Sequence, residues 1–173
     1  MPSWRNVRVI AFFFFAELLF TGCGAAKSQA SGVSAPDFEL RDTSGKTVRL
    51  SQFKGHPVLL DFWATWCGPC LYSIPSTEKL YEANKDKGLI VLGLNMDDDP
   101  SDVPAFVKRL KMTYPVLYAG SSTVPGNYGL EGLPLFIVID AEGRVTHRYD
   151  GFSPVVMDAL DSELTQMASA RKS

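Results

Sequence analysis

The sequence predicts an α/β fold, a three-layer α/β/α sandwich built on a mixed central sheet. Three short runs, at Val58–Trp63, 89–94 and 135–140, have the apolar composition of buried strands. Segments with helical features separate these runs, and the chain ends on a helical pattern at 154–170. Strands interleaved with helices, followed by a hairpin and a final helix, are typical of that architecture.

Composition and charge are those of one globular domain with a substantial core. The chain has 173 residues, of which 46% are hydrophobic and 21% charged. Its formal net charge of −2 gives no electrostatic reason to expect a nucleic-acid partner.

The first structured segment is expected to be a β-hairpin. Residues 36–40 alternate in polarity, 42–46 carry turn residues, and 47–50 return as the partner strand. Ser51 is expected to cap a short turn over 52–54.

The strand at Val58–Trp63 has apolar residues on both faces, which predicts a central strand covered on both sides. The helix that follows is expected to run from Cys67 to about Asn84, with a kink at Pro75. Together with the strand at 89–94 it predicts a βαβ unit with parallel strands and a right-handed crossover.

The second half of the chain continues the pattern. The acidic segment after the 89–94 strand lacks the ligand spacing of a calcium loop, so we expect a solvated surface loop there. The remaining expected elements are a helix that is capped by Ser101 or Asp102 and runs to about Lys111, a strand at 114–118, a helical turn at 124–128, and antiparallel strands at 135–140 and 145–149.

Residues 1–22 are predicted to be an export signal. Arg5 and Arg8 precede an apolar stretch at 9–20 that is too short to span a bilayer comfortably. The stretch is followed by small residues and Cys23, as in a bacterial lipobox, although Glu17 interrupts the apolar run and Phe20 stands where leucine is preferred. We therefore expect lipidation at Cys23.

Residues 23–34 are expected to form a flexible tether, and 35–173 the folded domain. The tether is mostly Ser, Ala, Gly, Gln and Lys, which cannot bury a core. An uncleaved N-terminal anchor and soluble export remain open as alternatives to lipidation. All three place the domain outside the cytoplasm, where disulfides persist.

Cys67 and Cys70, separated by Gly68 and Pro69, form a C-x-x-C motif directly after the Val58–Trp63 strand. A helix starting at Cys67 would place Cys70 about one turn along, close enough for a disulfide. The helix N–H groups would lower the pKa of the Cys67 thiol. A C-x-x-C at a strand-to-helix junction therefore indicates a redox site.

Two other interpretations of the motif are weaker. Zinc would need about four ligands, and His56 and His147 have no ligand spacing to the cysteines. A purely structural disulfide here would close too small a loop to restrict the unfolded chain much. We expect no metal and no cofactor beyond the Cys67–Cys70 disulfide itself.

Asp61 is the only charged residue in the Val58–Trp63 strand. A lone buried carboxylate costs free energy unless it is neutralised or paired, and burial raises its pKa. Its position six residues before Cys67 can place it beneath the helix that carries Cys70, where it could take the proton of that thiol through a water. The alternative is an idle, solvated aspartate at a frayed strand end.

The segment 61–70, the Gly-Leu-Pro at 132–134 and the strand after it together resemble the thioredoxin superfamily. The stretch 35–38 with its hairpin is similar to the membrane-tethered thiol–disulfide oxidoreductases of the TlpA/ResA type, within the broader redoxin (AhpC-TSA) family. The resemblance covers roughly residue 34 to the C-terminus. It implies a thioredoxin-like fold with an N-terminal β-hairpin extension.

The resemblance also implies roles for individual residues. The Leu133–Pro134 bond would be cis and face the dithiol, and the backbone of Leu133 would pair with a substrate polypeptide. Cys67 would attack a disulfide of a protein substrate, and Cys70, helped by Asp61, would release the reduced product. The apolar docking surface would consist of Trp66, Gly68, Pro69, Leu133 and Pro134.

The Gly-Pro pair between the cysteines resembles the reducing members of the superfamily. A reductant outside the cytoplasm must be recharged, which implies a membrane-embedded thiol donor as partner. Members that serve cytochrome c maturation often carry a glutamate where this chain has Ser73. That departure weakens a dedicated role in cytochrome maturation.

Two alternative functions are kept. A thiol peroxidase of the redoxin family would carry Thr or Ser three residues before its reactive cysteine to orient peroxide, and Ala64 holds that position relative to Cys67. A non-catalytic binding module on a thioredoxin fold would have no need of both Cys67 and Cys70.

Overall fold

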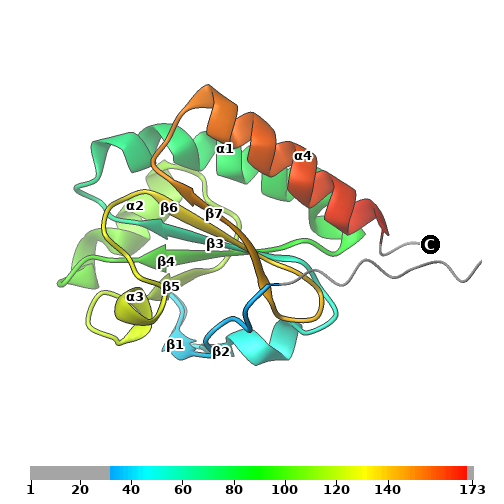
Figure 1. Ribbon diagram of the computed structural model, residues 1–173. Coiled ribbons are helices and arrows are strands. Elements are labelled where there is room, and N and C mark those ends of the chain that lie inside the picture. The colour runs from blue at the N-terminus through cyan, green and yellow to red at the C-terminus, as the bar shows by residue number, and fades with distance from the viewer. Residues whose placement is uncertain (1–31, 171–173) are drawn as a thin grey trace, which may run out of the picture.

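The computed structural model describes residues 32–170 and contains a five-stranded mixed sheet in the order β5-β4-β3-β6-β7 (Figure 1). β3 runs parallel to β4, and β4 runs parallel to β5, whereas β6 is antiparallel to β3 and β7 is antiparallel to β6. The strands are β3 (Val58–Trp63), β4 (Ile90–Asn95), β5 (Val116–Tyr118), β6 (Leu135–Ile139) and β7 (Val145–Asp150). The predicted mixed sheet, with its βαβ unit and final hairpin, is confirmed.

β3 lies at the centre because both of its faces are apolar. Every residue of the strand is buried. Its side chains alternate between two cores, with Leu59 and Trp63 in one and Leu60 and Phe62 in the other. Asp61 stands two residues from both Leu59 and Trp63 in the strand, so its side chain lies on the same face of the sheet as theirs.

Helices cover the Leu59/Trp63 face. α1 (Gly68–Asn84) and α4 (Pro154–Ala170) lie side by side over it (Figure 1). The buried stripe of α4, which includes Leu160 and Leu164, packs into the same core. α2 (Val103–Arg109) adds Val103 to this core.

The opposite face has a different cover. The hairpin β1 (Glu39–Arg41) and β2 (Thr47–Arg49), the 3-10 turn η1 (Leu50–Phe53) and the short α3 (Val124–Asn127) supply it. The fold class is therefore confirmed, but the layer under the sheet consists of a hairpin and single turns instead of long helices. The two cysteines lie at the junction between the carboxyl end of β3 and the start of α1.

The predicted cap at Ser51 is wrong, whereas Asp102, one of the two residues expected to cap the next helix, is the N-cap residue of α2, although its side chain makes no capping hydrogen bond. η1 begins at Leu50, so Ser51 lies inside the turn, and its N–H donates to the Asp37 carboxylate at 2.9 Å. The turn η3 (Pro100–Asp102) begins after Asp99, whose side chain accepts from the Ser101 N–H at 3.0 Å. Pro100 fits the first position of that turn because its lack of an N–H costs nothing there.

Contacts with the domain begin slightly before the predicted boundary at residue 35. The Val145 N–H donates to the Val33 carbonyl at 2.8 Å, and the Ala35 N–H donates to the Gly143 carbonyl at 2.9 Å. A Cβ on Gly32 would lie 2.2 Å from the Val145 oxygen, so this approach requires glycine.

The export signal predicted at residues 1–22 and the lipidated Cys23 lie outside the described residues. Within residues 32–170, no helix combines the length and apolar character needed to cross a membrane.

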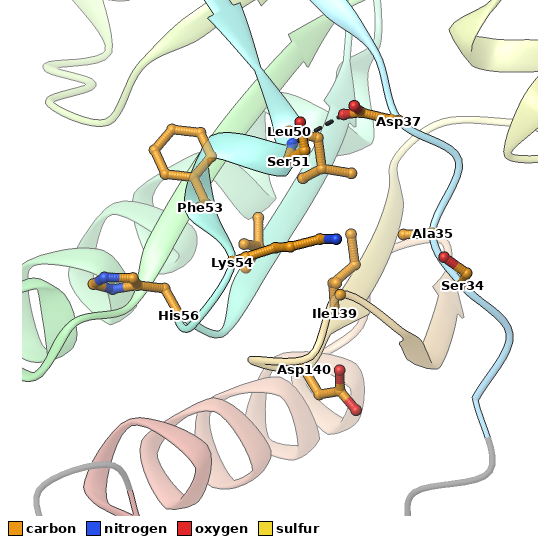
Figure 2. A pocket seen from close by; sticks show the side chains of 12 residues that line it. Ser34, Ala35, Asp37, Leu50, Ser51, Phe53, Lys54, His56, Ile139 and Asp140 are labelled. Atoms are coloured by element: carbon orange, nitrogen blue, oxygen red, sulfur yellow. Dashed lines mark hydrogen bonds between the residues drawn. The ribbon is translucent and has the colours of Figure 1, made fainter.

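A cavity of about 130 Å³ lies between the N-terminal segment and η1. Figure 2 shows the Lys54 side chain extending across it, near Ile139 and Ala35. Val58, the first residue of β3, lines this cavity, whereas Cys67 follows the other end of that strand. The cavity is therefore remote from the redox motif.

Candidate active site

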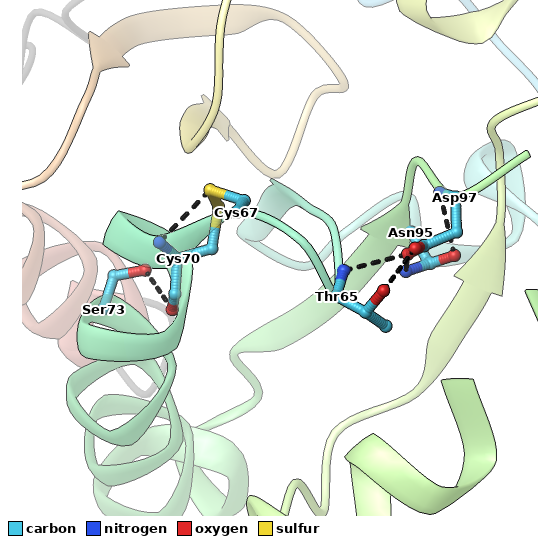
Figure 3. The surroundings of a disulfide bond; sticks show 6 residues. All are labelled: Thr65, Cys67, Cys70, Ser73, Asn95 and Asp97. Carbon is cyan, nitrogen blue, oxygen red and sulfur yellow. Dashed lines mark hydrogen bonds between the residues drawn. A yellow bond between two sulfur atoms is a disulfide. The ribbon is translucent and has the colours of Figure 1, made fainter. Parts of the chain in front are cut away.

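Cys67 and Cys70 form a disulfide at the start of α1, with their Cα atoms 5.3 Å apart. Cys67 is the N-cap residue, and the backbone N–H of Cys70 donates to its sulfur at 3.2 Å (Figure 3). The prediction that the helix begins directly after Cys67 is confirmed. After reduction, the same N–H and the positive end of the helix would stabilise a thiolate on Cys67.

The two cysteines differ in access to solvent. Cys67 is 5% exposed and Cys70 is fully buried. Trp66, at 69% exposed, precedes them, and Gly68 and Pro69 are exposed between them. Cys67 therefore keeps a small exposed area, whereas Cys70 has none.

The Leu133–Pro134 peptide bond is cis, as the resemblance implies. Pro134 is buried, and its carbonyl accepts the Gly151 N–H at 2.8 Å. Leu133 is half-buried and packs against the core that contains both cysteines.

Asp61 is completely buried in the middle of β3, opposite Gly93 of β4 and Phe136 of β6. The Tyr114 hydroxyl donates to its Oδ2 at 3.1 Å. Desolvation raises the pKa of Asp61 to about 7, although the bond from Tyr114 acts in the opposite direction. The alternative of a solvated aspartate at a frayed strand end is therefore excluded.

The carboxyl group of Asp61 and the two cysteines border the same core. The face of β3 that carries Asp61 is the one covered by α1, whose first turn contains Cys70. Cys70, Trp63 and Tyr114 all belong to this core.

Asp97 is a site residue that the sequence interpretation missed. Its carboxylate accepts hydrogen bonds from the Thr65 N–H at 3.0 Å, from the Thr65 hydroxyl, and from the Asn95 amide at 2.6 Å (Figure 3). The expectation of a solvated acidic loop holds for Asp98 and Asp99, which are exposed, but is wrong for Asp97. Asp97 ties the loop before Cys67 to the end of β4.

Tyr114 is the second residue that was missed. It stands 53 residues from Asp61 in the chain, so no local pattern links the two. The sequence indicated Tyr114 only as the first residue of a short strand at 114–118.

Ser73 is buried, and its hydroxyl donates to the Cys70 carbonyl at 3.0 Å (Figure 3). The position that holds a glutamate in many cytochrome-maturation members therefore contains a neutral hydroxyl whose donor is already satisfied.

No group of three or more His, Cys, Asp or Glu side chains within residues 32–170 could hold a metal ion. His56 bonds the Gly88 carbonyl through its Nδ1 at 2.9 Å, and Nδ1 of His147 lies 2.6 Å from Glu163. Neither histidine forms part of a cluster with the two cysteines.

Sequence comparison identifies the family. A family model described as Redoxin matches residues 30–163. The chain belongs to the redoxin family. This redoxin is 34% identical over 134 residues to the thiol-disulfide oxidoreductase ResA of Bacillus cereus, and the match covers 77% of this chain and 78% of that protein.

Solved structures with the same fold are similar to this redoxin. A candidate thiol:disulfide interchange protein DsbE from Chlorobium tepidum has a TM-score of 0.75 and 34% identity, covering 79% of this chain and 96% of that chain. The pneumococcal exposed lipoprotein thioredoxin Etrx1 from Streptococcus pneumoniae has a TM-score of 0.65 and 34% identity, covering 76% of this chain and 99% of that chain. With its disulfide at the start of α1, this redoxin is a thiol–disulfide oxidoreductase of the ResA-like type.

Proposed function

We propose that this redoxin reduces disulfides of protein substrates outside the cytoplasm. The observation that carries the proposal is the unequal pair of cysteines at the start of α1: Cys67 is the N-cap residue and is 5% exposed, whereas Cys70 is fully buried. This arrangement suits an attacking thiolate followed by an internal resolving thiol.

The reaction has two exchange steps. The Cys67 thiolate attacks one sulfur of the substrate disulfide, the other sulfur leaves as a thiolate, and a mixed disulfide forms. Cys70 then loses its proton and attacks the Cys67 sulfur, which releases the second substrate thiolate. The substrate gains two electrons, and the Cys67–Cys70 disulfide forms.

Asp61 is proposed to take the proton of Cys70. Its side chain lies on the side of the sheet covered by α1. A carboxyl group whose pKa is raised to about 7 exchanges protons readily near neutral pH, as a general base requires.

The substrate is proposed to dock on the apolar surface beside Cys67. Trp66, Gly68 and Pro69 are exposed next to Cys67 in the chain, and Leu133, next to the buried Pro134, packs against the core that contains Cys67. An extended polypeptide would pair with the backbone of Leu133.

Lipidation of Cys23 is proposed to hold the domain at the outer side of a membrane, where a membrane-embedded thiol donor would reduce the disulfide again. The signal-like residues 1–22 support this location. The relative from Streptococcus pneumoniae is described as an exposed lipoprotein.

The direct test is insulin reduction by dithiothreitol together with trapping. We expect the protein to accelerate the reduction of insulin disulfides, and Cys67→Ala to abolish the acceleration. Cys70→Ala should accumulate a mixed disulfide on Cys67, because the resolving sulfur is missing. Consumption of peroxide without insulin reduction would instead support a thiol peroxidase.

A further inference from the structure

The carboxyl group of Asp61 has two unequal oxygen atoms. Oδ2 accepts the hydroxyl of Tyr114 at 3.1 Å. Oδ1 is buried and has no hydrogen-bond partner among the described residues. The Asp61 side chain is completely buried and Tyr114 is 2% exposed, so bulk water does not provide a hydrogen-bond partner for Oδ1.

α1 fixes the position of the Tyr114 ring. The N–H of the preceding Thr113 donates to Oε2 of Glu78 at 2.8 Å, and the Thr113 hydroxyl donates to Oε1 of Glu82 at 2.8 Å. The ring of Tyr81 contacts the Tyr114 ring edge-on, with centroids 6.0 Å apart. The helix that carries the two cysteines therefore also orients the hydroxyl that binds Asp61.

Gly93 on the neighbouring strand leaves room for this arrangement. A Cβ there would lie 3.0 Å from Cε2 of Tyr114 and 3.2 Å from Nε1 of Trp63. Nε1 of Trp63 is, like Oδ1 of Asp61, buried without a hydrogen-bond partner among residues 32–170. The unpaired acceptor of Asp61 and the unpaired donor of Trp63 thus lie on the same face of β3, beside Gly93.

We propose that Tyr114 is a positioning residue for thiol exchange: its hydroxyl holds Oδ2 of Asp61 and leaves Oδ1 as the oxygen that receives the proton of Cys70. The inference rests on the proposed role of Asp61 and adds to it the oxygen used and the residue that selects it.

Protons and electrons balance in the proposed step. The Cys70 S–H proton moves to Oδ1, the resulting thiolate attacks the Cys67 sulfur, and the substrate sulfur leaves with the electron pair of the broken bond. Burial and the charge of Asp61 hold the pKa of Tyr114 well above its usual value, so its hydroxyl remains a donor throughout. Tyr114 itself neither gains nor loses a proton.

Few other titratable groups bear on this pair. α1 contributes Glu78, whose charge also raises the pKa of Tyr114, and Tyr81, in addition to the two cysteines. β4 and β6 place only Gly93 and Phe136 opposite Asp61. The Tyr114 bond favours the ionised carboxylate, so removing it should raise the pKa of Asp61 further.

The test compares Tyr114→Phe with Tyr81→Phe in the full-length chain. Tyr81→Phe removes a phenol oxygen from the same ring pair without touching Asp61. In the oxidised protein, difference infrared titration should place the Asp61 carboxyl about one pKa unit higher in Tyr114→Phe, and at the wild-type position in Tyr81→Phe.

The kinetic readout uses dithiobis(nitrobenzoate) with the reduced protein. The first thiol released reports attack by Cys67, and the second reports resolution by Cys70. At about neutral pH, Tyr114→Phe should slow only the second release, by about fivefold, because a shift of one unit lowers the ionised fraction of Asp61 from about one half to about one tenth. The two rates should converge at higher pH, where the carboxylate is ionised in both proteins.

A second substitution keeps the inference testable if Tyr114→Phe folds poorly. Replacing Tyr114 with 3-fluorotyrosine preserves the ring and strengthens the donor, so it should lower the pKa of Asp61. Unshifted titration in both Tyr114 variants would overturn the inference. If Asp61→Asn itself retains the wild-type pH profile of the second release, the proposed base is wrong instead.

Discussion

Asp61 is the residue whose charge the fold controls most strongly. It lies in a fully buried strand, and its one hydrogen bond comes from a neutral hydroxyl. Desolvation therefore outweighs that bond, and the pKa rises. The burial that suits Asp61 to its proposed role as a base also makes the protein less stable when this carboxyl group is ionised.

We predict that Asp61→Asn stabilises the oxidised protein above neutral pH. Between about pH 4 and about pH 7 the folded state holds a proton that the unfolded state has lost, so the free energy of unfolding falls as pH rises. A pKa displaced from 3.8 to about 7 corresponds to a loss on the order of 4 kcal/mol at alkaline pH.

Urea unfolding of the oxidised protein across this pH range would measure the effect. The variant should show little decline in that window, whereas Asp158→Asn, on the exposed surface of α4, should follow the wild type. An equal decline in Asp61→Asn and the wild type would contradict the buried, protonated carboxyl.

Gly93 is a second residue of interest, because the core around Asp61 has no room for a side chain at this position. We predict that Gly93→Ala destabilises the protein by about 1–3 kcal/mol, because the new methyl group overpacks a filled core. It would press on Tyr114 at 3.0 Å and on Trp63 at 3.2 Å. Denaturant unfolding would measure the change.

Gly126→Ala is the matched control for this substitution. Nothing lies within 4 Å of a Cβ at Gly126, which stands in α3. We expect it to be neutral or to stabilise by up to about 1 kcal/mol. Equal effects of the two substitutions would show that packing around Gly93 has no influence.

The junction between β3 and α1 is held by side chains from a third element. Asp97, beyond the end of β4, accepts both the N–H and the hydroxyl of Thr65. The Met96 N–H also donates to the Trp63 carbonyl at 2.8 Å. The loop that presents Trp66 and Cys67 is thereby fixed to the central sheet.

We predict that Asp97→Ala loosens this loop and costs about 1–3 kcal/mol of stability, because it removes the acceptor of three donors, two on Thr65 and one on Asn95. Amide hydrogen exchange at Thr65 should accelerate. Asp98→Ala is the control, since Asp98 is exposed and makes none of these bonds. An unchanged rate of amide exchange at Thr65 in Asp97→Ala would contradict the role of Asp97 in fixing this loop.

The molecule as a whole separates the Cys67–Cys70 disulfide from the N-terminal segment at residues 32–35. The cysteines lie after the carboxyl end of β3, whereas Val33 and Ala35 pair near the beginning of β7. The two cores on either side of the sheet are formed by residues between Phe38 and Ala168. An anchor preceding residue 32 would thus be compatible with an accessible disulfide.

We predict that a chain beginning at Gly32 folds and retains insulin reduction at about the wild-type rate, because its cores and cysteines are complete. It should not fractionate with membranes, and Cys23→Ser in the full-length chain should likewise lose lipid attachment. A folded but inactive shortened chain would show that residues 1–31 take part in exchange.

Local patterns were sufficient for most of the fold and for the reactive pair. The apolar run of Val58–Trp63 predicted a strand buried on both faces, and the spacing of Cys67 and Cys70 predicted a disulfide at the start of a helix. Both follow from chain geometry within a few residues. The lone charge of Asp61 likewise indicated a raised pKa, since its environment was set by its own strand.

The hydrogen-bond partners of these groups depend on the tertiary structure. Tyr114 reaches Asp61 across 53 residues, and Asp97 reaches Thr65 across 32, so neither contact leaves a local trace. The cover of the second sheet face by a hairpin was also decided by packing. Local patterns therefore identified the disulfide cysteines and the buried carboxyl group. Which oxygen of Asp61 is free and how the loop before Cys67 is held follow only from the folded chain, because both depend on distant segments meeting in space.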